Sequence, residues 1–252
     1  MPTPVVLPRR TWGAADAPRR ALLVHGLGSN GALMWRFGTA LADAGYRVDA
    51  VDLRGHGTAP RVLDYTLEAF GADVHATRPS DADAWDLVIG HSLGGAATVL
   101  ASAADPTWAR QLVLIDPGLR LEEAEREIVR QGQVDAFANP STADDLRATY
   151  PHWHPHDIEL KVVAIAQASQ WAVEQVSSQN ATWDVMDAAA RLRVPTHIIG
   201  ADPAVYSIFT GPVATEFLRS GLATMSVVRG AGHSPHRDDP DATLAQLFEA
   251  IA

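Results

Sequence analysis

Short apolar segments that alternate with helical patterns are the feature that most constrains how this chain can fold. Strands that are apolar along their whole length are buried on both faces of a sheet, and helical connections between them make the strands parallel. The segments with this character are Ala21–Val24, Tyr46–Val51, Asp86–Ile89 and Gln111–Ile115, and the helical patterns include Met34–Ala44 and Leu67–Thr77. The sequence therefore predicts an α/β fold with a parallel sheet between two layers of helices.

The alternation stops between Leu119 and Arg193, where almost every segment has a helical pattern. Strand patterns then resume at Thr196–Gly200 and Ala223–Arg229, and a last helix starts near Asp239. The helices expected in between are Leu121–Ala138, a short one after Ser141, Ile158–Val176 and Trp183–Leu192. We interpret residues 1–118 and 194–252 as an α/β core and residues 119–193 as a helical lid inserted after the fourth predicted parallel strand.

Composition and charge argue against several classes of function. The chain contains no cysteine, which excludes disulfide scaffolds, thiolate nucleophiles and cysteine-ligated metals. A net charge of −10 argues against nucleic acid as a partner. The first residues lack the apolar region of a signal peptide, and no apolar run approaches the roughly 18 residues of a membrane span. We therefore expect a cytoplasmic protein that does not insert into membranes.

The motif Gly90-His91-Ser92-Leu93-Gly94 lies between a predicted strand and a predicted helix. The pattern Gly-x-Ser-x-Gly alone is weak, but this position between strand and helix is typical of a nucleophilic serine. The serine must occupy a tight turn that projects its hydroxyl, and bulky neighbours would clash there. Ser92 is therefore the predicted nucleophile.

A serine nucleophile needs a base and an orienting acid. His233 follows the last predicted strand and is the expected base, with His236 as the nearest rival. Asp202 follows Thr196–Gly200 and is the preferred acid. Asp116, at the end of Gln111–Ile115, is the alternative, because an acid after that earlier strand can reach the same histidine.

The loop His25-Gly26-Leu27-Gly28 follows the first predicted strand and is suited to binding an oxyanion. We predict that the backbone N–H groups of Leu27 and Leu93 form the oxyanion hole. The same loop contains the spacing Gly-x-Gly-x-x-Gly of dinucleotide-binding proteins, but that signal is weak alone. A dinucleotide-binding protein would also have an acidic residue at the end of the next strand. The candidate at that position is Asp52, which begins the segment DLRGHG instead. No cofactor is expected.

Taken in order, the segments HGLGSNG, DLRGHG, GHSLGG and GAGH resemble the α/β-hydrolase superfamily, most closely its lidded esterase, lipase and perhydrolase branch. The resemblance covers nearly the whole chain. It implies a Ser92–His233–Asp202 triad and a sheet of about eight strands, with an N-terminal hairpin that looks abbreviated. The segment Gly200-Ala201-Asp202 is shorter than the family pattern, which keeps Asp116 open as the acid.

Aromatic residues in the lid and after the oxyanion loop suggest an apolar substrate pocket. The residues expected to bind substrate are Met34, Trp35, Trp153 and Trp183. The run from His152 to His156 has histidines at alternate positions, but it lacks a fourth ligand, so no metal is expected.

We expect hydrolysis of a small-molecule carboxylic ester or lactone with an apolar acyl or alcohol moiety, through an acyl-enzyme intermediate. The alternatives are C–C bond hydrolysis or perhydrolysis by the same triad, and a ligand receptor that uses the hydrolase pocket. The sequence leaves the oligomeric state open, with a homodimer among the options.

Overall fold

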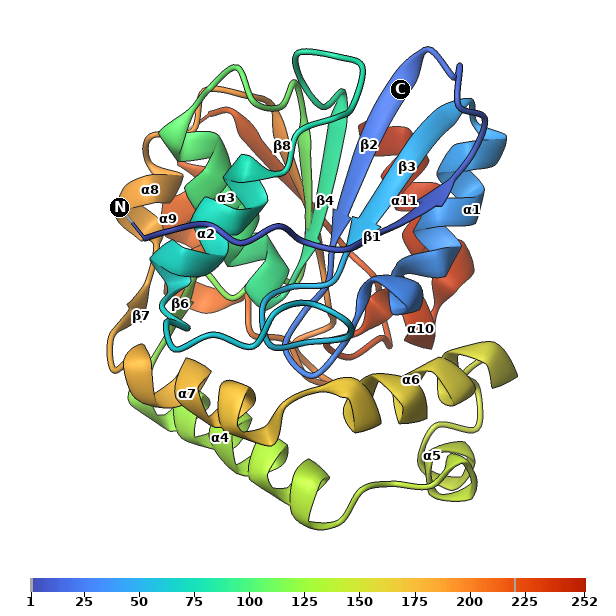
Figure 1. Cartoon of the computed structure of the whole chain (residues 1–252), viewed down its shortest axis with the longest axis vertical. Coiled ribbons are helices and arrows are strands. Elements are labelled where there is room, and N and C mark those ends of the chain that lie inside the picture. The colour runs from blue at the N-terminus through green and yellow to red at the C-terminus, as the bar shows by residue number, and fades with distance from the viewer. Residues whose placement is uncertain (1, 220) are drawn as a thin grey trace.

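A seven-stranded sheet forms the centre of the computed structural model, which describes residues 2–219 and 221–252 (Figure 1). In sheet order the strands are β1 (Arg9–Trp12), β3 (Tyr46–Val51), β2 (Arg19–Val24), β4 (Leu87–His91), β5 (Leu112–Ile115), β8 (Thr196–Gly200) and β9 (Ala223–Val227). Only β1 runs antiparallel to its neighbour, and the other pairs are parallel. The predicted α/β class is confirmed.

The described part of the main sheet has fewer strands than the eight expected. The missing strand would precede β1, where the chain contains Pro2, Pro4 and Pro8. Proline has no N–H to donate to a strand ladder, which disfavours a regular hairpin there.

Helices cover both faces of the sheet (Figure 1). Side chains of β2 alternate between the two faces, with Leu22 in one apolar cluster and Leu23 in the other. The first cluster includes residues of α2 (Leu67–Ala76), α3 (Leu93–Ala104), α8 (Met186–Ala189) and α9 (Gly211–Leu218). The second includes residues of α1 (Trp35–Asp43), which follows the short 3₁₀ helix η1 (Gly31–Met34), and of α11 (Pro240–Ala250). The sheet is therefore buried on both sides, as its apolar strands require.

Four further helices form a layer of their own beyond one end of the sheet, at the bottom of Figure 1. They are α4 (Glu123–Ala138), α5 (Ala143–Thr149), α6 (Pro155–Gln167) and α7 (Gln170–Gln179). The chain enters and leaves this layer through a two-stranded antiparallel pair, β6 (Arg120–Leu121) and β7 (Trp183–Asp184). We refer to α4–α7 as the helical layer. Its function as a lid remains a prediction.

Two helices of this region differ from the sequence expectation. The predicted helix Ile158–Val176 is divided between α6 and α7, because Ala168 has extended backbone angles and the N–H of Ser169 donates to Gly55 O at 3.0 Å. The predicted helix Trp183–Leu192 starts as strand β7, since Trp183 pairs with Leu121 and only Met186–Ala189 is helical. Both differences come from contacts with residues distant in sequence.

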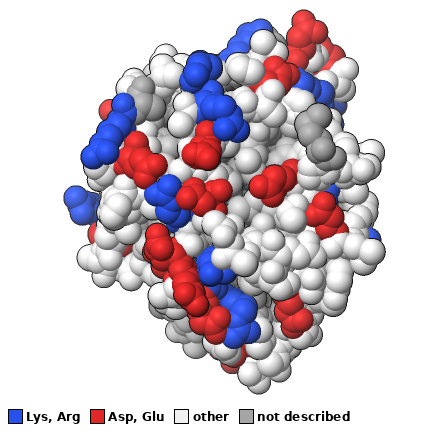
Figure 2. All heavy atoms as spheres, turned by 90° about the vertical axis from the view of Figure 1, so that its left-hand side faces the viewer, with Lys and Arg blue, Asp and Glu red and all other residues white. Residues whose placement is uncertain are grey.

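The surface carries charges of both signs. Figure 2 shows acidic and basic side chains interspersed on the face that it presents.

Within residues 2–219 and 221–252, none of the helices is long and apolar enough to cross a membrane.

Candidate active site

Ser92 occupies the sharp turn between β4 and α3. Its φ of 54° and ψ of −119° are unfavourable for a residue with a side chain, so the turn stores backbone strain. The flanking glycines explain how the chain tolerates this geometry. A Cβ added to Gly90 would lie 2.6 Å from the carbonyl oxygen of Gly94, and one added to Gly95 would lie 2.6 Å from Cβ of Pro117. The local sequence is therefore the one that this turn requires.

Ser92, His233 and Asp116 form one connected hydrogen-bonded chain. The distance from Ser92 Oγ to His233 Nε2 is 2.9 Å, and that from His233 Nδ1 to Asp116 Oδ2 is 2.6 Å. An ionised Asp116 can only accept, so Nδ1 carries the proton and Nε2 is left to accept from the serine hydroxyl. This is the arrangement in which a histidine acts as a general base towards serine.

Pairing of neighbouring strands brings Ser92 and Asp116 to the same level of the sheet. The N–H of Ser92 donates to Ile115 O at 3.1 Å, and the N–H of Asp116 donates to Ile199 O at 3.0 Å. Both residues thus follow the carboxyl ends of adjacent parallel strands, β4 and β5. His233 reaches them from the loop between β9 and α10 (Pro235–Asp238).

The carboxylate of Asp116 is fully buried and surrounded by donors. Ser207 Oγ donates to Oδ1 at 2.6 Å, and the N–H of Ile208 donates to Oδ2 at 3.1 Å. Burial alone would raise the pKa of Asp116, but the hydrogen bond and charge of His233, with the bonds from Ser207 and Ile208, hold the pKa below its ordinary value. Asp116 is therefore held as an anion beside His233.

The structure contradicts the preference for Asp202 as the acid. The alternative, Asp116, is the carboxylate that contacts His233. Asp202 accepts from the N–H of Ala204 at 2.9 Å and from the N–H of Gly230 at 2.8 Å. These bonds lower the pKa of Asp202, the bond from Gly230 contributing most. Asp202 thus fastens a turn to the loop that precedes His233, and its carboxylate has no bond to the imidazole. Asp202 comes only two residues after Gly200, the end of β8, and therefore lies within the turn that its carboxylate closes.

Both predicted oxyanion donors line the cavity next to Ser92. Leu93 is the first residue of α3, so its N–H has no acceptor within the helix. Leu27 lies in a loop that approaches the serine so closely that a Cβ on Gly26 would lie 2.9 Å from Cβ of Ser92. Both segments with the predicted donors thus lie next to Ser92, and their role as an oxyanion hole stays a prediction.

Two buried histidines hold the Leu27 loop in place. His25 Nδ1 lies 2.7 Å from Gly26 O, and its Nε2 accepts from the N–H of Leu53. His56 Nε2 accepts from the N–H of Gly28 at 3.1 Å. Burial lowers the pKa of His25 to about 4 and that of His56 to about 3, so both rings are neutral at pH 7. The residues on either side of Leu27 are thereby fixed by hydrogen bonds.

A cavity of about 510 Å³ lies between Ser92 and the helical layer. Helix α4 lines it with one face, which consists of Ile128, Val129, Gly132, Gln133, Ala136 and Phe137. Trp153 and Trp183 also line the cavity, as expected of substrate-binding residues. Their indole N–H groups are used elsewhere, donating to Asp238 and to Gly118 O respectively, each at 2.7 Å. The ring of Trp153 also stacks on Tyr150, with 4.1 Å between the ring centroids, and it lies under the guanidinium of Arg237. Trp153 therefore belongs to a cluster of Tyr150 and Arg237 at the cavity wall, whereas Trp183 adds apolar wall.

Met34 and Trp35, the other two predicted substrate-binding residues, are not among the residues that line this cavity. Met34 is 1% exposed and packs in the apolar cluster under α1. Trp35 donates from Nε1 to Asp157 Oδ1 at 2.7 Å, which fastens the start of α6 to the core. The expectation for these two side chains was wrong, because the chain turns them into the core and towards α6.

The histidines between Pro151 and Asp157 have separate partners. His152 contacts Asp238, and His154 accepts from the N–H of His156 as the cap of α6. No group of three or more His, Asp or Glu side chains within the described residues is arranged to hold a metal ion.

Lys161 and Arg237 also line the cavity, and the sequence analysis did not single out either one. Two signals could have pointed to them. Lys161 is the only lysine of the chain, and Arg237 lies four residues after His233.

Residues 21–247 match the model of a family described as "Alpha/beta hydrolase family". A solved structure of E-2-(acetamidomethylene)succinate hydrolase superposes with a TM-score of 0.82 at 23% identity, covering 97% of this chain and 94% of that one. The chain is 34% identical over 115 residues to lipase LipV of Mycobacterium tuberculosis, which covers 45% of this chain and 43% of the lipase. It is 36% identical over 110 residues to a pimeloyl-[acyl-carrier protein] methyl ester esterase of Neisseria meningitidis, covering 44% and 41%.

The family match spans most of the sequence, and the chain therefore belongs to the α/β-hydrolase family. The two curated relatives match over less than half of their own length. Their matched parts are similar to this chain, and their activities are a starting point for a proposal.

Proposed function

We propose that this protein is a serine hydrolase that cleaves a carboxylic ester or lactone through an acyl-enzyme intermediate. The observation that carries the proposal is the continuous path from Ser92 Oγ through His233 to the buried carboxylate of Asp116, open to a cavity. The similarity to a lipase and to a methyl ester esterase supports the same reaction class.

In this mechanism Ser92 Oγ attacks the carbonyl carbon of the ester while His233 Nε2 takes the hydroxyl proton. The carbonyl oxygen becomes an oxyanion that accepts from the N–H groups of Leu27 and Leu93. The bond between the carbonyl carbon and the alkoxide oxygen then breaks, and His233 donates its proton to that oxygen, so the alcohol leaves. The acyl group stays bonded to Ser92 Oγ. Water, activated by His233, hydrolyses this acyl-enzyme by the same steps. Asp116 holds the imidazole in one tautomer and stabilises its cation.

Residues 119–193 act in this proposal as a lid over the site. Helix α4 contains no buried residue, and its apolar face lines the cavity, although Val129 also packs against the main apolar cluster. A cover of this kind excludes water from the oxyanion and buries apolar parts of the substrate.

Labelling with a fluorophosphonate probe tests the nucleophile. Because the probe bonds only to an activated serine, the wild type should be labelled and Ser92→Ala should not. Ser234→Ala is a matched control, since Ser234 also lines the cavity, and it should remain labelled. Equal labelling of the wild type and Ser92→Ala would contradict the proposal.

The apolar wall predicts a dependence on acyl length. Each buried methylene contributes about 0.8 kcal/mol, so kcat/KM should rise by one to two orders of magnitude from acetyl to about butyryl or hexanoyl esters. Kinetics with a series of p-nitrophenyl esters would measure this rise. Trp153→Ala and Trp183→Ala should flatten it more than they reduce turnover of the acetyl ester. A profile that peaks at acetyl and is unchanged in both variants would remove the apolar-pocket interpretation.

A further inference from the structure

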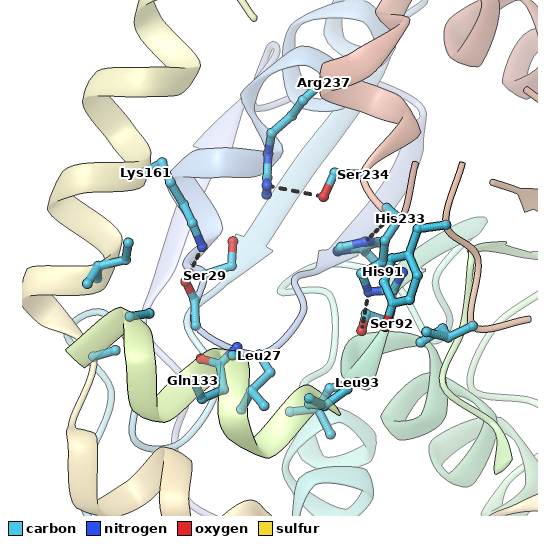
Figure 3. A pocket seen from close by; sticks show the side chains of 18 of the residues that line it. Leu27, Ser29, His91, Ser92, Leu93, Gln133, Lys161, His233, Ser234 and Arg237 are labelled. Atoms are coloured by element: carbon cyan, nitrogen blue, oxygen red, sulfur yellow. Dashed lines mark hydrogen bonds between the residues drawn. The ribbon is translucent and has the colours of Figure 1, made fainter. Parts of the chain in front are cut away.

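The cavity beside Ser92 has an unusual charge for this protein. The chain has 30 acidic residues and 20 Lys and Arg, yet the 28 residues that line the cavity include Lys161 and Arg237 and no Asp or Glu. The two cations come from different elements, α6 and α10, and point towards the same part of the cavity in Figure 3. A cavity of this composition attracts anions even though the protein as a whole repels them.

Arg237 is 4% exposed and has unused donor capacity. Its Nη1 donates weakly to Ser234 Oγ at 3.3 Å, and its Nε has no hydrogen-bond partner within the described residues. Its guanidinium lies over the ring of Trp153, 5.3 Å from the centroid. The nearest carboxylates, Asp157 and Asp238, are bonded to other donors and form no salt bridge with it.

Lys161 completes the same part of the cavity. Its Nζ donates to Gly28 O at 3.0 Å and has two further donors. Beside it, Ser29 is 3% exposed, lines the cavity and has a hydroxyl with no hydrogen-bond partner in the part of the chain that the structure describes. Burial and the charge of Arg237 lower the pKa of Lys161 to about 7, so the amine is partly neutral at pH 7 and a bound anion would favour its protonated form.

Arg237 is buried, Lys161 is partly buried, and neither forms a salt bridge with a carboxylate of the described residues. A bound anion that accepts from both would offset the cost of keeping these groups away from water. The groups here are separate from the oxyanion donors, Leu27 and Leu93, so they suit a second anionic group of the substrate. We propose that the substrate carries, besides the ester that Ser92 attacks, a carboxylate that binds between Lys161 and Arg237 with the hydroxyl of Ser29 as a further donor. This inference rests on the proposed ester hydrolysis and narrows its substrate class to carboxylate-bearing esters.

The test compares charged and neutral esters of equal length. One arm uses monomethyl esters of dicarboxylic acids from succinate to suberate, which place the carboxylate on the acyl side, against methyl esters of the corresponding monocarboxylic acids. The other arm compares butyryl esters of hydroxy acids with butyryl esters of simple alcohols. The hydroxy acids place the carboxylate on the alcohol side of the ester. A hydrogen bond to a charged group contributes about 1.5–3 kcal/mol, so the wild type should favour the charged member of one arm by about 10- to 100-fold in kcat/KM.

Variants assign that preference to residues. Lys161→Met and Arg237→Met should each reduce the charged-to-neutral ratio of kcat/KM by about tenfold or more, mainly through KM, and Lys161→Arg should restore most of it. The control is Arg130→Met, which removes an exposed cation of α4 that is paired with Glu127 and lies outside the cavity. It should leave the ratio unchanged. Thermal unfolding of each variant identifies any loss of fold.

Calorimetry with Ser92→Ala separates failure of the inference from failure of the proposed function. Monomethyl adipate should bind this variant at least tenfold more tightly than methyl hexanoate, and Lys161→Met added to Ser92→Ala should abolish the difference. If the wild type hydrolyses neither series but this binding preference is present, the ester-hydrolase proposal fails and the anion subsite stands. Equal kcat/KM for charged and neutral esters in both arms, or a preference that survives both Lys161→Met and Arg237→Met, would overturn the inference.

Discussion

Asp116→Asn is expected to lower kcat by about four orders of magnitude, whereas Asp202→Asn should lower it by less than about tenfold. Removal of an orienting acid from a serine triad typically costs about 10⁴ in turnover. Asp116→Asn removes the negative charge beside His233 and leaves one oxygen where two accept from His233 Nδ1, the N–H of Ile208 and Ser207 Oγ. In the orientation that turns the NH₂ group to His233, the amide donates to the imidazole instead of accepting from it. The imidazole would then accept at Nδ1 and carry its proton on Nε2, so it could no longer accept the proton of Ser92.

The two variants are matched controls, because each replaces one carboxylate by an amide of the same shape. Asp202→Asn weakens bonds to the N–H groups of Ala204 and Gly230, so its expected effect is a modest loss of stability. Steady-state kinetics on one ester and thermal unfolding of both variants would measure the difference. A larger loss of turnover in Asp202→Asn than in an equally folded Asp116→Asn would reassign the acid.

Acidification is expected to unfold the protein between about pH 6.5 and pH 4. Both His25 and His56 have pKa values lowered by burial, to about 4 and about 3, against about 6.5 in an unfolded chain. Below pH 6.5 the unfolded chain takes up protons that the folded chain does not, so the free energy of unfolding falls as the pH falls. At pH 4.5 each of the two rings should have lowered the free energy of unfolding by about 3 kcal/mol relative to pH 7. This is a large share of the roughly 5–15 kcal/mol that is typical of a folded domain.

Urea denaturation at pH 7, 5.5 and 4.5 would measure this loss. His56→Gln should give a shallower dependence on pH from a lower starting stability, because it removes one buried ring. The control is His152→Asn, which replaces a ring whose side chain is 50% exposed in the fold and should leave the slope unchanged. A free energy of unfolding that is constant from pH 7 to pH 4.5 would contradict the expectation.

The sequence could predict those features that depend on neighbours along the chain. The apolar runs predicted the buried parallel strands, because a strand needs apolar side chains on both faces to lie within such a sheet. The turn at Ser92 could also be predicted, since Gly90, Gly94 and Gly95 are within three residues of it and their lack of a side chain is what the turn requires. The position of His233 after the last strand likewise follows from the order of elements.

The tertiary structure alone decided the acid, the pocket residues and the division of α6 from α7. Asp116 and Asp202 each follow an apolar strand, and local sequence does not distinguish them. Their difference lies in where the 202–209 segment folds back, since it brings Ser207 and Ile208 to Asp116 while Asp202 closes its own turn. In the same way, the cation pair of Lys161 and Arg237 joins residues far apart in sequence. Side-chain direction and long-range pairing fix such features, and a pattern of residue types along one chain contains neither.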